Sequence, residues 1–220
     1  MRWWNVNPRI KEVAATASLL AYKCIDSPVV VASTGRSGST MLCHAVMNSM
    51  LRSRRGGRFH PRLVFFPAFD RERIKLHDGA VHKTHLLAHH FPSSSKCIFI
   101  YDDPNISKQS FVDCCAKYGR EWGEQHLKNL ESPYGVNASG EHDVLNYKNQ
   151  INSWYNRKQC LIVRYNKVWE YQDEISDFLG LSVCLPPRLE RATKGSSVGG
   201  LMIDELSLLY QELPEFVINE

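Results

Sequence analysis

Short apolar runs of strand length alternate along this chain with stretches whose apolar residues recur at helical spacing. The expected strands are PVVVAS (28–33), GAVHKTH (79–85), KCIFIY (96–101) and QCLIVRY (159–165). The expected helices lie at residues 39–52, 105–119, 141–156 and 167–181. Continuous apolar strands that alternate with helices are typical of a parallel sheet buried on both faces. The sequence therefore predicts an α/β fold with a parallel central sheet flanked by helices.

Composition limits the classes of protein to which the chain can belong. Hydrophobic residues make up 43% and charged residues 23%, which favours a packed globular core. The net charge of +4 is too small to indicate nucleic-acid binding, although it suits an anionic ligand. No apolar run approaches the length of about 18 residues that a membrane span needs, so we expect no membrane contact.

The cysteines indicate the redox state of the protein, whereas the basic residues leave two interpretations open. There are seven cysteines without a CxxC spacing and no export signal, so we expect reduced thiols and a cytoplasmic protein. The segment RSRRGGRFHPR (52–62) holds five arginines and no acidic residue. This cluster is either a solvated basic loop or a surface for an anionic acceptor.

A glycine- and serine-rich turn follows the first expected strand, in PVVVASTGRSGSTML (28–42). Gly35 and Gly38 let the backbone curl so that free amides point at one centre, and the next helix adds its positive end. Arg36 supplies a fixed charge with a planar fork of donors. The hydroxyl donors of the turn are Ser37, Ser39 and Thr40. The turn is therefore expected to bind a phosphate or a sulfate.

The same turn is not a Walker A motif, because the two glycines are too close and no lysine follows the second one. A P-loop kinase or another nucleotide-phosphate enzyme therefore remains an alternative with a weak basis. A second alternative is a nucleotide- or sulfate-binding protein without catalytic activity.

Four segments resemble the sulfotransferase superfamily, whose members use 3′-phosphoadenosine 5′-phosphosulfate (PAPS). GRSGST (35–40) is similar to the family's 5′-phosphosulfate loop, and IFIYDDPNISKQS (98–110) to the segment that holds the 3′-phosphate. LIVRYNKVWE with ISDFLGL (161–181) and ATKGSSVGG (192–200) are similar to two later motifs, in the family's order. The resemblance implies the P-loop NTPase-like sulfotransferase fold and transfer of a sulfuryl group to a hydroxyl of a glycan or small molecule, without a metal.

The length of 220 residues suits a single domain over residues 1–220, with or without a small appendage. We expect an N-terminal helical segment at 1–26, the nucleotide-binding core at 28–200 and a C-terminal helix at 201–220. Residues 120–140 show no clear pattern and are expected to form a loop that faces the substrate. The oligomeric state is not indicated by the sequence.

Catalytic roles follow from the resemblance residue by residue. VHKTHLL (81–87) is similar to a segment in which a histidine is the general base and a lysine stabilises the transferring group. These roles fall on His85 and Lys83, which alternation places on one side of a strand. Arg36 takes the role of the cation beside the 5′-phosphate. Asp70 or Glu72 is the alternative base, because the carbohydrate branch often uses a carboxylate.

The nucleotide-binding roles are implied in the same way, with Gly35, Ser37, Gly38, Ser39 and Thr40 around the 5′-phosphate. Further along the chain, the resemblance implies that Ser110 binds the 3′-phosphate, that Tyr165 contacts the adenine, and that Lys194 and Gly195 close over the nucleotide.

Three features depart from the family's pattern. The closing loop, which usually offers Arg-Lys-Gly, reads Thr193-Lys194-Gly195 here, with one extra residue before Gly199. The site where an arginine usually precedes Ser110 holds Asp102, and the usual adenine-stacking tryptophan is replaced by Met41. Arg191 and Lys108 are the candidates that could replace the missing arginine.

Overall fold

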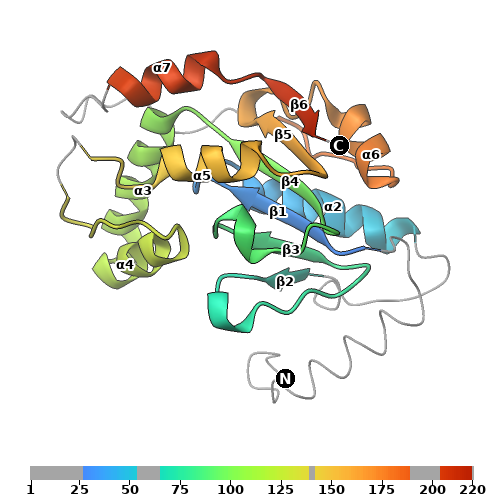
Figure 1. Ribbon diagram of the computed structural model, residues 1–220, viewed down its shortest axis with the longest axis horizontal. Coiled ribbons are helices and arrows are strands. Elements are labelled where there is room, and N and C mark those ends of the chain that lie inside the picture. Colours follow the sequence, from blue (N-terminus) through green and yellow to red (C-terminus); the bar gives the residue numbers. More distant parts are fainter. Residues whose placement is uncertain (1–26, 54–64, 139–141, 189–203, 220) are drawn as a thin grey trace.

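The computed structural model describes residues 27–53, 65–138, 142–188 and 204–219. These residues contain a six-stranded sheet in the order β2-β3-β1-β4-β5-β6 (Figure 1). The strands are β1 (Val29–Ser33), β2 (Phe65–Pro67), β3 (Val81–Thr84), β4 (Lys96–Tyr101), β5 (Cys160–Arg164) and β6 (Phe216–Asn219). Neighbouring strands run parallel, except that β6 pairs antiparallel with β5. The predicted α/β fold with a parallel central sheet flanked by helices is confirmed.

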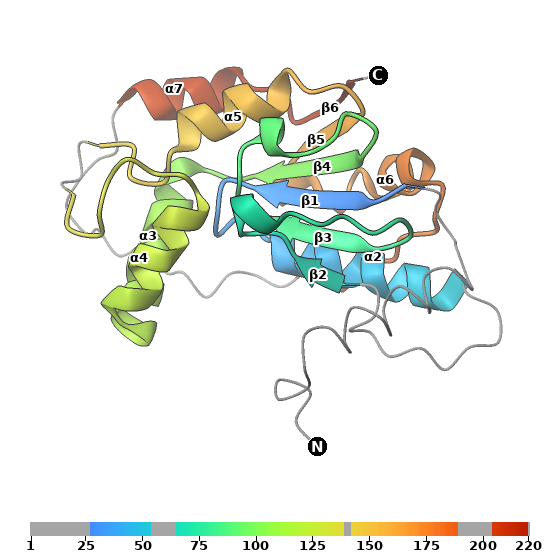
Figure 2. The same cartoon turned by 60° about the horizontal axis from the view of Figure 1, so that its bottom comes forward.

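Helices cover both faces of this sheet and its carboxyl end (Figure 2). They are α2 (Ser39–Ser53), α3 (Pro104–Tyr118), α4 (Arg120–Asn129), α5 (Tyr147–Tyr155), α6 (Gln172–Leu179) and α7 (Asp204–Glu212). Core residues of α2 and α6 pack on one face, whereas those of α5 and α7 pack on the other. The α3–α4 pair lies beyond the carboxyl ends of the strands, as Figure 2 shows.

The two faces explain why the central strands have continuous apolar sequences. In β1, Val29 and Val31 belong to the core under α2, and Val30 and Ala32 belong to the core under α5. All five residues of β1 are buried. A strand with helices on both sides has no solvated face, so polar residues cannot alternate along it.

Residues 120–140, expected as a loop, begin with α4. Gly119 ends α3 with a φ of 89° and donates its amide to the Cys115 carbonyl, so the chain turns sharply and a second helix starts at Arg120. On the inner side of α4, Leu127 belongs to a small core cluster and His126 is buried. The helix packs through few apolar residues, which is why its sequence pattern is weak.

Three other expected boundaries differ from the structure. The helix expected at 141–156 begins at Tyr147, after Asn146 in a left-handed conformation. The helix expected at 167–181 is a 3₁₀ turn at Tyr165–Lys167 followed by α6. The expected C-terminal helix at 201–220 is wrong at its end, because α7 stops before Pro214 and the β-branched run that follows forms β6. The expected N-terminal helical segment at 1–26 lies outside the described residues.

Arg164, at the end of β5, holds the chain segment between α7 and β6. Its Nε donates to the Tyr101 hydroxyl at 3.1 Å, and its Nη2 donates to the carbonyl groups of Tyr210 (2.6 Å) and Leu213. The Tyr101 hydroxyl in turn donates to the Pro214 carbonyl. The guanidinium also lies over the Tyr210 ring, 4.5 Å from its centre. The same side chain therefore connects the last parallel strand to the antiparallel one.

Six of the seven cysteines lie in the described part of the chain, and none of these six forms a disulfide. Burial raises the pKa of the Cys43 thiol to about 12 and that of Cys97 to about 11, so both stay protonated at neutral pH. Of the helices in the described ranges, none is long and apolar enough to cross a membrane.

His82, in β3, is buried and has an incompletely paired ring. Its Nε2 accepts from the His77 amide at 3.0 Å, and its Nδ1 has no partner among the described residues. The ring stacks on Phe66. Burial lowers the pKa of His82 to about 4.

We predict that acid destabilises the fold and that His82→Phe reduces this dependence. Between about pH 6.5 and pH 4 the unfolded chain protonates His82 while the folded chain does not, so stability falls as the pH falls. Removing one such site lowers the slope of the unfolding free energy by up to about 1.4 kcal/mol per pH unit. Urea denaturation at several pH values measures the slope. His142→Phe, at an exposed histidine, is the control, and equal slopes in all three proteins would contradict the prediction.

Candidate functional site

The turn from β1 into α2 adopts a conformation that few side chains tolerate. Three of its residues have a positive φ: Gly35 (79°), Arg36 (57°) and Gly38 (81°). The carbonyl of Gly38 accepts from the Leu42 amide and so starts the hydrogen bonding of α2. A turn with several left-handed residues can leave backbone amides pointing to one side, and here it leads directly into the first turn of α2. This arrangement is suited to an anion.

Both glycines of the turn are in close contact with side chains from distant segments. A Cβ on Gly35 would lie 3.0 Å from His126 Nε2 and 3.2 Å from Leu130, both from the α4 region. A Cβ on Gly38 would lie 2.2 Å from the ring of Tyr165, which follows β5. The turn is therefore packed between α4 and the end of β5, and only glycine leaves room for these contacts.

The hydroxyl groups of the turn are largely used inside the protein. Ser37 is fully buried, and its Oγ hydrogen bonds with Thr34 Oγ1 at 2.7 Å and with the Gly35 carbonyl at 3.0 Å. Ser37 Oγ also lies 3.5 Å from Ser107 Oγ in α3. The side chain of Ser37 thus stabilises the turn from inside, and Ser37 does not line the cavity.

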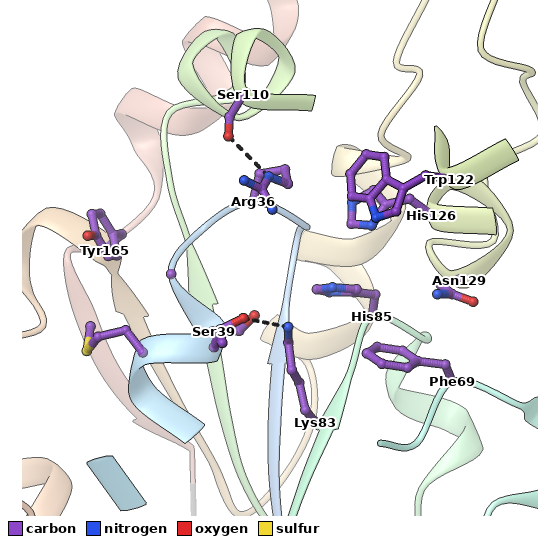
Figure 3. Close-up of a pocket in the computed structure, with 13 residues that line it drawn as sticks. Arg36, Ser39, Phe69, Lys83, His85, Ser110, Trp122, His126, Asn129 and Tyr165 are labelled. Carbon is purple, nitrogen blue, oxygen red and sulfur yellow. Dashed lines mark hydrogen bonds between the residues drawn. The ribbon is translucent and has the colours of Figure 1, made fainter. Parts of the chain in front are cut away.

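A cavity of about 710 Å³ opens beside this turn (Figure 3). Its lining comes from the turn and α2, from the segments around β2 and β3, from α3 and α4, and from the end of β5. The lining residues are Arg36, Gly38, Ser39, Thr40, Met41, Phe69, Lys83, His85, Ser110, Trp122, His126, Asn129 and Tyr165. The volume is in the range of small-molecule and cofactor sites, about 300–1,000 Å³.

Arg36 connects the turn to α3. Its Nε donates to Ser110 Oγ at 3.1 Å, and its guanidinium lies 6.0 Å from the centre of the Trp122 ring in α4. Figure 3 shows Arg36 between Ser110 and Trp122 at the cavity. The sequence placed Arg36 and Ser110 at two ends of one nucleotide, and the structure brings both side chains together in the same cavity.

Lys83 lies across the turn from Arg36. Its Nζ donates to Thr40 Oγ1, in the first turn of α2, at 2.7 Å. Burial lowers the pKa of Lys83, and the positive charge of Arg36 lowers it further. Two cationic side chains thus face one cavity with little acidic compensation in its lining, which favours an anionic ligand.

His85 is buried at the end of β3, and its hydrogen bonds determine its tautomer. Its Nδ1 lies 3.0 Å from Ser33 Oγ and 3.3 Å from the Ser33 carbonyl. A carbonyl only accepts, and Ser33 Oγ already donates to Ser39 Oγ, so we assign the proton to Nδ1. The lone pair is then on Nε2. Burial, the neighbouring His126 and the charges of Lys83 and Arg36 hold the pKa of His85 well below its usual value, so the ring is neutral at physiological pH.

His126 is a site residue that the sequence did not reveal. It stacks on Trp122, with ring centres 4.9 Å apart, and lies edge-on to His85 at 5.1 Å. Its Nε2 is buried and has no hydrogen-bond partner in the described part of the chain. Burial, with the charges of Arg36 and Lys83, lowers its pKa to about 4. In the sequence, His126 lies within residues 120–140, a stretch without a clear helical or strand pattern. That stretch was expected to face the substrate, and this was the only indication that His126 could belong to the site.

Of the remaining predicted site residues, some line the cavity and others do not. Tyr165 lines the cavity, whereas Gly35 and Ser37 lie behind it. The alternative bases Asp70 and Glu72 are exposed in a 3₁₀ turn and do not line the cavity.

Part of the predicted site lies outside the described residues. This applies to Lys194, Gly195 and Arg191, and to the basic cluster at 52–62 except for its first two residues. Arg52, within the described part, is exposed and donates to Ser49 Oγ.

Asp102 does not lie in the cavity lining. It is 4% exposed, and its carbonyl accepts from the Tyr147 hydroxyl in α5 at 2.8 Å. Burial and then the charge of Asp102 raise the pKa of Tyr210 in α7. Asp102 is therefore a buried residue whose backbone is tied to α5, and it is not among the residues that line the cavity.

We predict that Gly38→Ala weakens ligand binding in the cavity, in addition to any loss of folding stability. The new methyl group would displace the Tyr165 ring, so we expect at least a tenfold loss of affinity for adenosine 3′,5′-bisphosphate by calorimetry. The control is Gly180→Ala, which also has a positive φ (65°) but no atom within 4 Å of the new Cβ. It should lose about 1–2 kcal/mol of stability and bind normally. Equal affinities in the two variants would contradict the role of the Gly38–Tyr165 contact.

The comparisons with known proteins find similarity among solved structures. No protein-family model matches the chain, and no curated protein matches it. Among solved structures, the chain is similar to mouse sulfotransferase SULT7A1, whose crystal structure was determined in complex with PAP. The two share 18% identical residues with a TM-score of 0.41, and the match covers 80% of this chain and 66% of that chain. The match therefore spans just under two thirds of the length of that chain.

Proposed function

We propose that the chain is a PAPS-dependent sulfotransferase that acts on a hydroxyl acceptor. One observation carries the proposal: an anion-binding turn with two cations and a neutral imidazole with a free lone pair face the same cavity. Sulfuryl transfer needs a binding site for the phosphosulfate, charge stabilisation on the leaving oxygen and a base for the acceptor hydroxyl. The four sequence segments that resemble sulfotransferases support the same conclusion.

The residues fit the donor nucleotide. The left-handed turn at residues 35–38 suits the 5′-phosphosulfate. Ser110, whose Oγ accepts from Arg36 Nε, would bind the 3′-phosphate, the role that the resemblance implies. The Tyr165 ring on Gly38 offers a flat apolar surface for the adenine.

PAPS would supply the sulfuryl group and the bisphosphate leaving group, and the protein would supply positions and charges. His85 Nε2 would accept the proton of the acceptor hydroxyl, because the bond from its Nδ1 to Ser33 fixes the ring and its tautomer. Arg36 and Lys83 would stabilise negative charge near the turn. Cationic groups in a low-dielectric site are worth more than they are in water.

The acceptor would enter between β3 and α4. Phe69 stacks on His85 with ring centres 5.3 Å apart, and Trp122 and His126 form the opposite wall. The Asn129 side chain lines the same part of the cavity (Figure 3). This wall combines aromatic surface with two polar groups, which suits an acceptor that carries both an apolar ring or chain and a hydroxyl.

A phosphotransferase is the second candidate, for one specific reason. Asp102 and Asp103 directly follow the apolar residues of β4, the strand beside β1. An acidic residue at such a strand end holds Mg²⁺ in P-loop enzymes. Here Asp102 is buried outside the cavity lining and Asp103 caps α3 through the Asn105 and Ile106 amides, so neither is placed as a metal ligand of the cavity. Magnesium-dependent ATP turnover would favour this candidate.

We predict that adenosine 3′,5′-bisphosphate stabilises the protein against heat and that Arg36→Ala removes the effect. At about 100 times its dissociation constant, a ligand adds about 2.7 kcal/mol. For a domain of this size that is a rise of roughly 5–10 °C in melting temperature. The matched control is Arg120→Ala, which removes an exposed arginine paired with Glu124 and should retain the full shift.

Three outcomes separate the candidates. A folded protein with no shift at millimolar ligand contradicts nucleotide binding. Binding of the bisphosphate without turnover of PAPS over a broad panel of hydroxyl acceptors supports the alternative of a binding protein. Turnover that Arg36→Ala lowers by about 100- to 1,000-fold, as for the loss of one transition-state contact, supports the sulfotransferase.

We predict that His85→Asn abolishes turnover and leaves nucleotide binding intact. The neutral ring is the active form, and its pKa is lowered by burial and by the nearby charges. The rate of the unmodified protein should therefore hold through pH 6.5 and fall only at clearly lower pH. The pH profile of kcat/KM measures this. His126→Asn is the comparison, and a larger loss of kcat in that variant would move the base to His126.

A further inference from the structure

We propose that His89, His90 and Glu131 form a binding site for a zinc ion on the surface of the protein. The site does not belong to the cavity lining and is independent of the proposed sulfuryl transfer. Its ligands come from two segments: the 3₁₀ turn Ala88–His90, which follows β3, and the residue two positions after α4.

The three side chains are close enough to share one ion. One ligand atom from each lies within 4.8 Å of the other two, and His90 Nε2 is 3.0 Å from Glu131 Oε1. The rings of His89 and His90 have centres 4.0 Å apart. Ligand atoms in a tetrahedral zinc site, at bonds of about 2.0–2.1 Å, are separated by about 3.4 Å. His89 is exposed, so its ring can make the small movement that this geometry needs.

The protein holds the carboxylate of Glu131 in place before any ion binds. Its Oε1 accepts from the Leu87 amide at 2.9 Å, and its side chain is only 14% exposed. Its backbone has a φ of 54°, a strained conformation for a residue with a side chain. The Asn146 Nδ2 donates to the Glu131 carbonyl at 3.1 Å and supports that conformation. A pre-positioned ligand lowers the entropy cost of assembling a metal site.

The donor set selects the class of ion. Two imidazole nitrogens and one carboxylate suit zinc better than calcium or magnesium, which prefer sites made of oxygen atoms alone. Three protein ligands leave a fourth position for water. Arg71 Nη1 lies 3.8 Å from Glu131 Oε2, and the Arg71 side chain is 60% exposed. It pairs with the other carboxylate oxygen and has room to turn away.

Such an ion would join two parts of the structure that also frame the cavity. The turn with His89 and His90 lies four residues after His85 in sequence, and Glu131 lies two residues after Asn129. In the metal-free form, His90 and Arg71 each make a weaker contact with Glu131. Zinc would replace these partly exposed contacts by coordinate bonds, and so fix the end of α4 against the segment that follows β3.

The test uses the whole chain without a polyhistidine tag, treated with a chelator and dialysed. Zinc chloride is titrated by calorimetry, and melting temperatures are recorded with and without the ion. Cobalt(II) is added separately, because tetrahedral cobalt gives intense visible absorption. The variants are His89→Ala, which changes an exposed side chain, and Glu131→Gln, which keeps an acceptor for the Leu87 amide. His142→Ala is the control, because it removes an exposed histidine elsewhere.

We expect one equivalent of zinc to bind, to raise the melting temperature and to give a tetrahedral cobalt spectrum. His89→Ala and Glu131→Gln should each weaken zinc binding at least tenfold while keeping the metal-free melting temperature within about 2 °C. His142→Ala should bind as the unmodified protein does. The proposal is overturned if no zinc binds at 0.1 mM (about ten times a 10 µM dissociation constant), or if the two cluster variants bind as tightly as the control. Binding of adenosine 3′,5′-bisphosphate is unaffected in either case, so this result is separate from the proposed function.

Discussion

The turn between β1 and α2 depends on side chains that press against its two glycines. His126 and Leu130 contact Gly35 from one side, and Tyr165 covers Gly38 from the other. Left-handed backbone conformations are costly for other residues, and here the space for a side chain is also filled. Because α4 and the end of β5 both rest on the turn, the position of the cavity walls is determined by the same contacts that shape the anion-binding backbone.

The electrostatics of the cavity follow from this packing. Arg36 and Lys83 are held near two buried imidazoles, and their charge adds to burial in keeping His85 and His126 neutral. An anion placed in the turn would offset that charge and so raise the pKa of both rings. The basicity of the candidate base would then increase when the nucleotide is bound. If the cavity holds an anionic nucleotide as proposed, binding would thus be coupled to proton transfer through the charges of Arg36 and Lys83.

The sequence was informative where local chemistry decides the structure. Continuous apolar runs predicted the central strands, and Gly35 and Gly38 predicted a curled turn after the first of them. It was less informative where contacts between distant segments decide. The inner side of α4 carries few apolar residues, so its helical pattern was weak and His126 was missed. The burial of Asp102 depends on α5 and α7, which no local pattern connects to the end of β4.

Some residues were predicted to bind the ligand because of their residue type alone, and the orientation of the side chain decides which of them face the cavity. The serine-rich turn suggested three hydroxyl donors for a ligand. In the structure Ser37 Oγ is engaged with Thr34 and the Gly35 carbonyl, while Ser39 and Thr40 line the cavity. Sequence gives the inventory of donors but not the side of the turn on which each one lies.

The bond network of Arg164 has a consequence for the behaviour of the protein in concentrated solution. β6 occupies one side of β5, a strand whose first four residues are all buried. Without that cover, β5 would present a row of unpaired amides and carbonyls on an apolar strand, which is a template for pairing with another chain. The hydrogen bonds from Arg164 to the segment before β6 keep that strand in register. A single guanidinium thus helps to keep the apolar strand β5 in the interior of the sheet, with the less buried strand β6 as its edge, a role separate from the chemistry of the cavity at the strands' carboxyl ends.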